Sequence, residues 1–358
     1  MVLGYCSISD FFALLKKIIS HIHGHRKAAT VAFVLVALSG AAFAAYNVVS
    51  QSIKRDGREK RVNVILKVPY GSVALYSGTQ QGEVVKVEAQ NSDPNDNPSM
   101  HLRYYYNPVG AYGLLKVTIG SDEGMIDRPK EYANGTPANF GYSLASFGTV
   151  HTDGGSYTRP MSQDLPNPSP NAPPTPADND FSRIFLTREI PVALHAELGF
   201  GESMLDLTGL ILTNTFIQTN ASRTRVVLRS PNTIPMENCV INAGLGECVV
   251  DGICNFNCRT FDFSGGLGYY ELHFTGDLQK NLEAKVEVGC GKVVINIPPN
   301  SARVQVTYDD NLFSSFAFQG LTKRRDGYYT SVGFDQSHAP ILTLHLSTGV
   351  GKMVVNYR

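Results

Sequence analysis

The sequence contains no tryptophan and no excess of charge of either sign, since 31 Lys and Arg residues balance 31 Asp and Glu residues. A chain without net positive charge lacks the broad electrostatic attraction that nucleic acids exert, so we expect no nucleic-acid partner. The chain also lacks a P-loop, a dinucleotide-binding fingerprint and a Gly-x-Ser-x-Gly nucleophile motif in a suitable context. It has no EF-hand pattern either. We therefore expect no cofactor, no catalytic residue and no bound metal.

Cysteine is scarce, with six in 358 residues. Cys6 stands alone near the start, and the other five fall between residues 239 and 290. Outside the cytoplasm Cys254 and Cys258 could close a short disulfide loop, and Cys239 could equally reach Cys258, because connectivity cannot be deduced from sequence. A single Cys-x-x-x-Cys without a second pair is not typical of a zinc site.

Long apolar runs are absent apart from one, residues 28–49, which is just long enough to span a bilayer. Ala42-Phe43-Ala44 within it matches the small-x-small pattern of a signal-peptidase site. The run is therefore either an uncleaved membrane anchor, which we favour, or an export signal cleaved after Ala44. Residues 1–27 would then form a cytoplasmic or membrane-surface segment. Both interpretations place the rest of the chain in the periplasm or outside the cell, tethered to the inner membrane in the first.

Glycine, by contrast, is abundant, and it forms a repeat. Three Gly-x-Gly pairs precede strand-like runs, and their second glycines, Gly246, Gly268 and Gly291, are spaced by 22 and 23 residues. Gly201 and a degenerate Ser222 extend the series upstream, and Gly351 extends it downstream. A fixed period in this range is typical of solenoids. The sequence therefore predicts an all-β fold, a parallel β-solenoid of ~22-residue coils with glycines at one corner.

Side-chain character repeats in phase with these glycines. The residues four places on are all aliphatic: Leu205, Val226, Val250, Leu272, Ile295 and Val355. The residues five places on are mostly polar: Asp206, Val227, Asp251, His273, Asn296 and Asn356. The residues one place before are all apolar: Phe200, Ala221, Leu245, Leu267, Cys290 and Val350. This alternation is that of a β-strand. Stacked coils would collect the aliphatic side chains in one inner column, and we expect Cys290 to be buried.

The repeat divides the chain. Residues 62–120 are predicted to form the first coils, with Gly113 as a further corner. Residues 121–181 form a Gly- and Pro-rich insert or linker that cannot join a ladder, and residues 182–358 form the main solenoid. Because the sequence ends at Arg358 directly after a coil, we expect an open sheet edge there that pairs with a protein partner or a second copy.

Three segments carry a resemblance to known proteins: IPVALHAELGFGESMLDLTGL, SGGLGYYELHFTGDLQ and EVGCGKVVINIPP. They resemble the bacterial toast-rack and cell-wall-active antibiotic response domains and the related adhesin-type solenoids. The resemblance covers residues 184–358, and residues 62–120 more weakly. It implies a membrane-tethered envelope protein with a parallel β-solenoid and no assigned catalytic residues.

These observations favour a non-enzymatic, membrane-tethered scaffold or interaction module, with a protein partner or a glycan as ligand. A first alternative is a carbohydrate-active enzyme that uses the outward polar column. Its acids Asp206 and Asp251 would lie two coils apart, about 10 Å, just beyond the separation of paired glycosidase carboxylates. A second alternative is an accessory subunit of a larger membrane complex, contacted through the N-terminal segments.

Overall fold

The computed structural model describes residues 48–90, 99–120, 181–299 and 302–358. These residues form seventeen strands and one 3-10 helix, η1 (Ile253–Phe256), so the predicted all-β fold is confirmed. Within the described ranges, no helix is both long and apolar enough to cross a membrane. Residues 1–47 and 121–180, on which the predicted anchor and insert fall, lie outside the described residues. Val48 and Val49, the end of the predicted anchor, begin strand β1 (Val48–Lys54).

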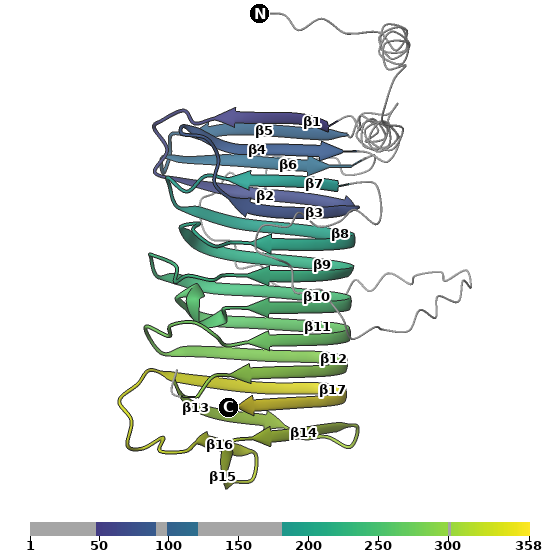
Figure 1. Ribbon diagram of the computed structural model, residues 1–358, viewed down its shortest axis with the longest axis vertical. Coiled ribbons are helices and arrows are strands. Elements are labelled where there is room, and N and C mark those ends of the chain that lie inside the picture. Colours follow the sequence, from purple (N-terminus) through teal and green to yellow (C-terminus); the bar gives the residue numbers. More distant parts are fainter. Residues whose placement is uncertain (1–47, 91–98, 121–180, 300–301) are drawn as a thin grey trace, which may run out of the picture. The chain divides into compact units, whose positions relative to one another are not determined.

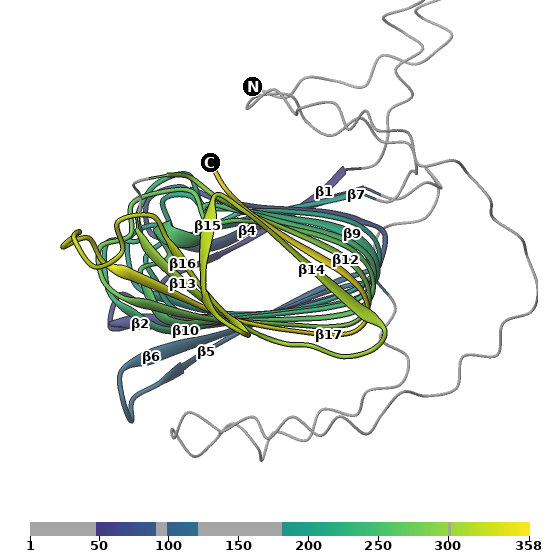
Figure 2. The same ribbon diagram turned by 90° about the horizontal axis from the view of Figure 1, so that it is seen from below.

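Six long strands form the centre of the fold. They are β8 (Val192–Asp206), β9 (Leu212–Val227), β10 (Met236–Asp251), β11 (Cys258–His273), β12 (Leu282–Ile297) and β17 (Ile341–Tyr357). Each bends in its middle, so that its two halves lie in two facing layers joined at a corner (Figures 1 and 2). Neighbouring strands pair in parallel, with Gly246 opposite Gly268 and Gly268 opposite Gly291. The predicted parallel solenoid is confirmed for this central part.

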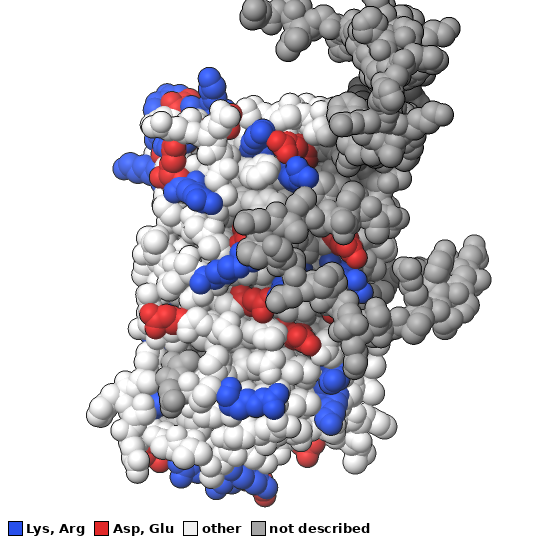
Figure 3. All heavy atoms as spheres, in the orientation of Figure 1, with Lys and Arg blue, Asp and Glu red and all other residues white. Residues whose placement is uncertain are grey.

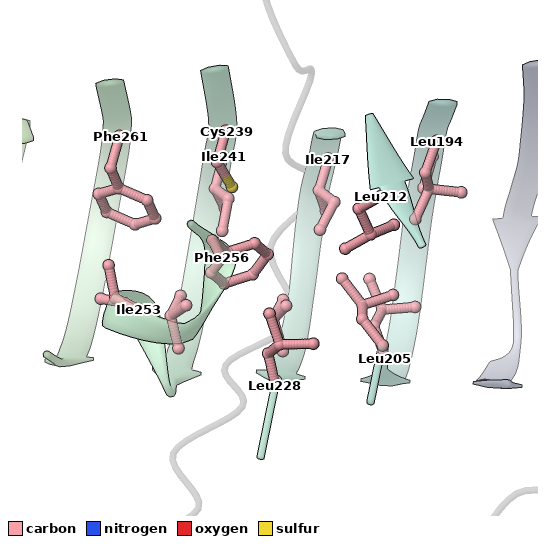
Figure 4. Packing of buried hydrophobic residues seen from close by; sticks show 14 of the residues in the cluster. Leu194, Leu205, Leu212, Ile217, Leu228, Cys239, Ile241, Ile253, Phe256 and Phe261 are labelled. Atoms are coloured by element: carbon pink, nitrogen blue, oxygen red, sulfur yellow. The ribbon is translucent and has the colours of Figure 1, made fainter. Parts of the chain in front are cut away.

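The core lies between the two layers. The predicted inner column, from Leu205 to Val355, is in register from coil to coil, and all six side chains are fully buried. Figure 4 shows side chains of the two layers pointing toward one another, with Leu194 and Ile217 on one side and Leu205 and Leu228 on the other. Burying each such side chain contributes roughly 1.5–3 kcal/mol.

Asparagines join successive coils on the side opposite the corner. The buried amide of Asn232 donates to Leu212 O (2.7 Å) and accepts from Leu212 N (2.9 Å). One coil further on, the amide of Asn255 donates to Leu228 O (2.7 Å). Each amide satisfies backbone groups of the preceding coil that the ladder leaves unpaired.

The N-terminal coils continue the same sheet. Strands β2 (Arg61–Tyr70) and β3 (Ser72–Ser77) form the coil that pairs with β8. Strands β6 (Tyr112–Ile119) and β7 (Phe181–Leu186) pair in parallel with β2 and β3, and so form the next coil. Residues 121–180 therefore interrupt a coil at its corner and do not link two separate solenoids. Gly113 lies opposite Val62 at the start of a layer, so its predicted corner position is wrong.

The outermost strands at this end run the other way. Strand β4 (Glu83–Gln90) is antiparallel to β7 and β1, and β5 (Met100–Asn107) is antiparallel to β6. The parallel solenoid is therefore confirmed only in part. Antiparallel pairing arises here because the chain reaches the two layers in the reverse order: β4 lies beside β7, and β5, which follows it in the sequence, lies beside β6.

The C-terminal end departs from the prediction. The chain forms β13 (Arg303–Asp309), β14 (Ser314–Gln319) and a hairpin of β15 (Leu321–Arg325) and β16 (Tyr328–Ser331) before it reaches β17. Strand β17 pairs with β12 on one side and with β13 and β14 on the other. The prediction of an open sheet edge at the last strand is therefore wrong, because both edges of β17 are paired. Strand β17 continues through its corner and matches β12 along its length, whereas β13 and β14 are separate strands.

Candidate functional site

The corner of each coil brings neighbouring backbones into contact. Gly246 and Gly291 have φ angles of 114° and 145°, in the range that favours glycine. A Cβ atom on Gly291 would lie well inside 3.0 Å of the carbonyl oxygen of Gly268, and the same clash occurs in turn at Gly351 against Gly291. The predicted corner glycines Gly201, Gly246, Gly268, Gly291 and Gly351 all lie at this corner, with Ser222 in the same register.

An apolar row runs along this corner on the outside of the fold. Tyr70, Phe200, Ala221, Leu245, Leu267, Cys290 and Val350 lie opposite one another in successive coils. Phe313 continues the row, because Gly351 N donates to its carbonyl oxygen (3.0 Å). We call these eight residues the corner ridge. At about 4.8 Å per strand it is on the order of 34 Å long.

The ridge is exposed. Its six large side chains have exposed fractions of 49–72%, and they account for six of the eleven large apolar side chains that the described residues expose. Cys290, expected to be buried, is only half-buried. The reason is the corner: the alternation of the first layer would bury this position, because Val288, two places before Cys290, is buried, but the alternation is interrupted where the chain turns, and the side chain before the corner glycine faces outward. Continuous apolar surface of this kind marks an interaction site.

Charged residues flank the ridge at the position after the corner in five coils, Glu202, Arg223, Glu247, Lys292 and Lys352, whereas Tyr269 follows Gly268. Arg223 lies 3.5 Å from Glu202 and 3.2 Å from Glu247, in the half of the ridge nearer the N-terminal coils. Lys292 and Lys352 lie opposite each other in the other half. Acidic and basic residues therefore alternate along the N-terminal half of this flank. Its charged residues in the C-terminal half are all basic.

Of the predicted polar column, Asp206, Asp251, His273 and Asn296 are half-buried on the outer side of their strands, whereas Val227 and Asn356 are buried. Figure 3 shows Lys and Arg interspersed with Asp and Glu on one face of the molecule. Asp206 pairs with Arg229, and Asp251 lies 2.7 Å from Arg225. His273 Nε2 lies 3.3 Å from Glu271 and 3.9 Å from Asp251. The hydroxyl of Tyr269 donates to Glu271.

Asp251 and Glu271 both lie beside the imidazole of His273. They are closer together than the acids of the predicted column, because Glu271 lies two places before His273 on the same face of its strand. Each carboxylate of the cluster has a charged or hydrogen-bonding neighbour. The arrangement is that of an ion-pair network across β9, β10 and β11. Among the described residues, no three His, Cys, Asp or Glu side chains converge as metal ligands would.

The cysteines of the solenoid are free thiols in the structure, including Cys239, Cys254 and Cys258, for which a disulfide was predicted. Cys254 Sγ donates to Phe274 O (3.2 Å). Burial raises the pKa of Cys254 and Cys258 to about 12, and likewise that of Cys248. Cys239, Cys248, Cys254 and Cys258 are therefore protonated core residues at neutral pH.

A small hollow lies beside the start of the ridge, with a volume of about 230 Å³. It is lined by the ends of β2 and β6 and by β8 and β9, and its polar groups include Gln218, Asn220 and a Lys67–Glu197 pair 3.1 Å apart. Its volume lies below the ~300–1,000 Å³ of small-molecule pockets, so it would hold only part of a ligand.

No family model matches the chain, and no curated protein is significantly similar to it in sequence. Two solved bacterial structures resemble it. One is a proposed cell adhesion protein from Clostridium sporogenes, with a TM-score of 0.37 and 11% identity over 87% of this chain and 100% of that one. The other is a proposed adhesin from Bacteroides fragilis, with a TM-score of 0.33 and 10% identity over 86% of this chain and 97% of that one. At these values the likeness carries no argument about function.

Proposed function

We propose that the protein is a non-enzymatic interaction module that binds a protein partner along the corner ridge. The observation that carries this proposal is the ridge itself, which exposes six large apolar side chains over eight consecutive register positions, with the smaller Ala221 and Cys290 half-buried between them. Interiors of protein interfaces are rich in such side chains and poor in charge. The ion-pair network on the neighbouring face has no comparable exposed apolar area.

The corner is a suitable support for a binding surface. Each ridge residue from Phe200 to Val350 lies next to a position where neighbouring backbones touch and has a ladder partner on both sides, which fixes its Cα position. A rigid surface loses little conformational entropy on binding, and this loss is a main cost of association.

We also propose that the module belongs to the cell envelope, held at the inner membrane by residues 28–47 or exported after cleavage at Ala44. The apolar run that supports this proposal leads directly into β1. Protease protection of the full chain in intact and permeabilised cells tests the location. Degradation only after permeabilisation of the inner membrane would contradict it.

Site-specific photo-crosslinking tests the binding surface. A photoreactive phenylalanine at position 245 or 267 of the full chain should give adducts of discrete mass in cells. The same group at Asn242, which lies on the outer face of β10 away from the ridge, should give none. Leu267→Ser should weaken the adduct at position 245. Absence of any ridge adduct, together with cleavage of envelope polysaccharide by the purified protein, would contradict the proposal and favour the enzyme.

A further inference from the structure

We propose that the partner on the corner ridge is a second copy of this chain, packed antiparallel to the first, ridge against ridge. This inference rests on the proposed function, since it names the occupant of the same surface. Three features of the described residues support it: the period of the ridge, its area and the charges on its flank.

The spacing of the ridge residues limits which kind of partner can contact all of them in the same way. Ridge residues are spaced by the separation of hydrogen-bonded strands, about 4.8 Å, over seven intervals. A helix repeats every 5.4 Å and would drift out of phase by more than half a turn over that distance. A partner that stays in phase must itself be a stack of strands with outward apolar side chains, and a second copy has that spacing and that surface.

The area is of the right order. A large apolar side chain that is about half exposed offers on the order of 100 Å². Six such side chains, together with Ala221, Cys290 and the flanking residues, approach the ~800 Å² per partner of a standard interface. The contact is therefore large enough for a specific dimer, although not for an obligate one.

The flanking charges favour the antiparallel arrangement. A two-fold axis that crosses the ridge between Leu245 and Leu267 brings the same flank of both copies together in reverse order. Glu202 of one copy then lies near Lys352 of the other. Arg223 meets Lys292, but Arg223 already has Glu202 and Glu247 within 3.5 Å. Opposite charges at the rim of an interface select orientation and partner.

The antiparallel arrangement has a consequence for the N-terminal ends of the two chains. In the antiparallel pair Val48 lies at opposite ends. Such a pair forms between chains on facing membranes, or between chains released by cleavage after Ala44.

The half-buried thiol of Cys290 provides the test. In the antiparallel pair Cys290 of one copy lies opposite Ala221 of the other, within reach of the 3.5–4.5 Å Cβ separation that a disulfide needs. Full-length Cys6→Ser protein carrying Ala221→Cys, in mild detergent with copper phenanthroline and oxygen, should form a covalent dimer whose peptide map joins positions 221 and 290. Asn242→Cys in the same background is the matched control and should not.

Each result of this experiment either supports or overturns the antiparallel dimer. We expect Leu245→Ser together with Leu267→Ser to lower the dimer yield by about tenfold, as for a hot spot in the centre of an interface. A 290–290 disulfide in the Cys6→Ser protein, with no gain from Ala221→Cys, would overturn the antiparallel arrangement. No dimer in any variant would overturn self-association. If photo-crosslinks at positions 245 and 267 then join another protein, or residues 121–180 of the same chain, the ridge still binds a partner and only the identity proposed here is wrong.

Discussion

At the scale of single residues, the corner glycines combine two requirements that are usually separate. Gly291 needs both a backbone angle that other residues rarely adopt and the absence of a Cβ atom, because the carbonyl oxygen of Gly268 occupies that space. Gly57 needs only the first, since nothing lies within 4 Å of its added Cβ.

Gly291→Ala should therefore lower the free energy of unfolding by roughly 2–4 kcal/mol, the sum of backbone strain and displacement of a neighbouring coil. Gly57→Ala, the matched control, should lower it by about 1 kcal/mol. Urea denaturation followed by circular dichroism measures both. Equal losses in the two variants would mean that the coils do not touch at the corner.

The thiols should also differ from one another in their reactivity toward a thiol reagent. In native Cys6→Ser protein, a maleimide should modify Cys290 and leave Cys239, Cys248, Cys254 and Cys258 unmodified, because burial excludes the reagent and raises the pKa of the four thiols. Mass spectrometry after digestion gives the sites. Rapid modification of Cys254 or Cys258 at neutral pH would show that the region around η1 opens readily.

Sequence reasoning succeeded and failed at this scale for identifiable reasons. The inner column from Leu205 to Val355 was predictable because burial on one face of a strand imposes a strict period. The exposure of Leu245 and Leu267 was not predictable, because the period is interrupted at the corner and the apolar character of these residues suggested burial. Tyr70 and Phe313 carried no signal, since neither lies in a recognisable repeat.

At the scale of elements, strand order at the two ends was beyond prediction. The repeat indicates which segments form coils, but not that β17 lies between β12 and the earlier β13 and β14. Only long-range pairing decides this, and no local pattern encodes it. The insert at 121–180 was recognisable from its prolines, whereas its position inside the corner of the β6–β7 coil follows only from the pairing of β7 with β3.

Deletions distinguish the central strand from the peripheral ones. Removing residues 321–331, the β15–β16 hairpin, should leave a cooperative unfolding transition, because it takes an antiparallel partner only from β13. Removing residues 341–358 should abolish the native transition of the C-terminal coils, since it strips β12, β13 and β14 of a shared partner and removes the fully buried Leu342, Leu344 and Val355. Limited proteolysis compares the two. Similar resistance would contradict a central position for β17.

At the scale of the whole molecule, the buried thiols and the buried tyrosine hydroxyl of the core make the free energy of unfolding depend on pH in the alkaline range. The folded-state pKa of Cys248, Cys254, Cys258 and Tyr270 is raised to about 12, mainly by burial. Unfolded thiols ionise near pH 8.5. The folded state therefore keeps protons that the unfolded state loses, so stability is full below that pH and falls as the pH rises toward 12.

We expect the free energy of unfolding to fall by about 1.4 kcal/mol per pH unit for each buried thiol above pH 9. Cys248→Ala should make this slope shallower by one such increment, whatever it does to stability at pH 7. Denaturation curves at pH 8, 9 and 10 measure it. An unchanged slope would mean that Cys248 ionises while the protein is folded.

The place of β17 also bears on how the chain is made. While it emerges from the ribosome, β13 and β14 are synthesised before the strand on which they pair, and the free edge of β12 stays uncovered until residue 341 and those after it are available. The strand made last thus lies between strands made before it, and a nascent chain stalled before that point would leave the backbone groups along this edge of β12 without their β17 partner.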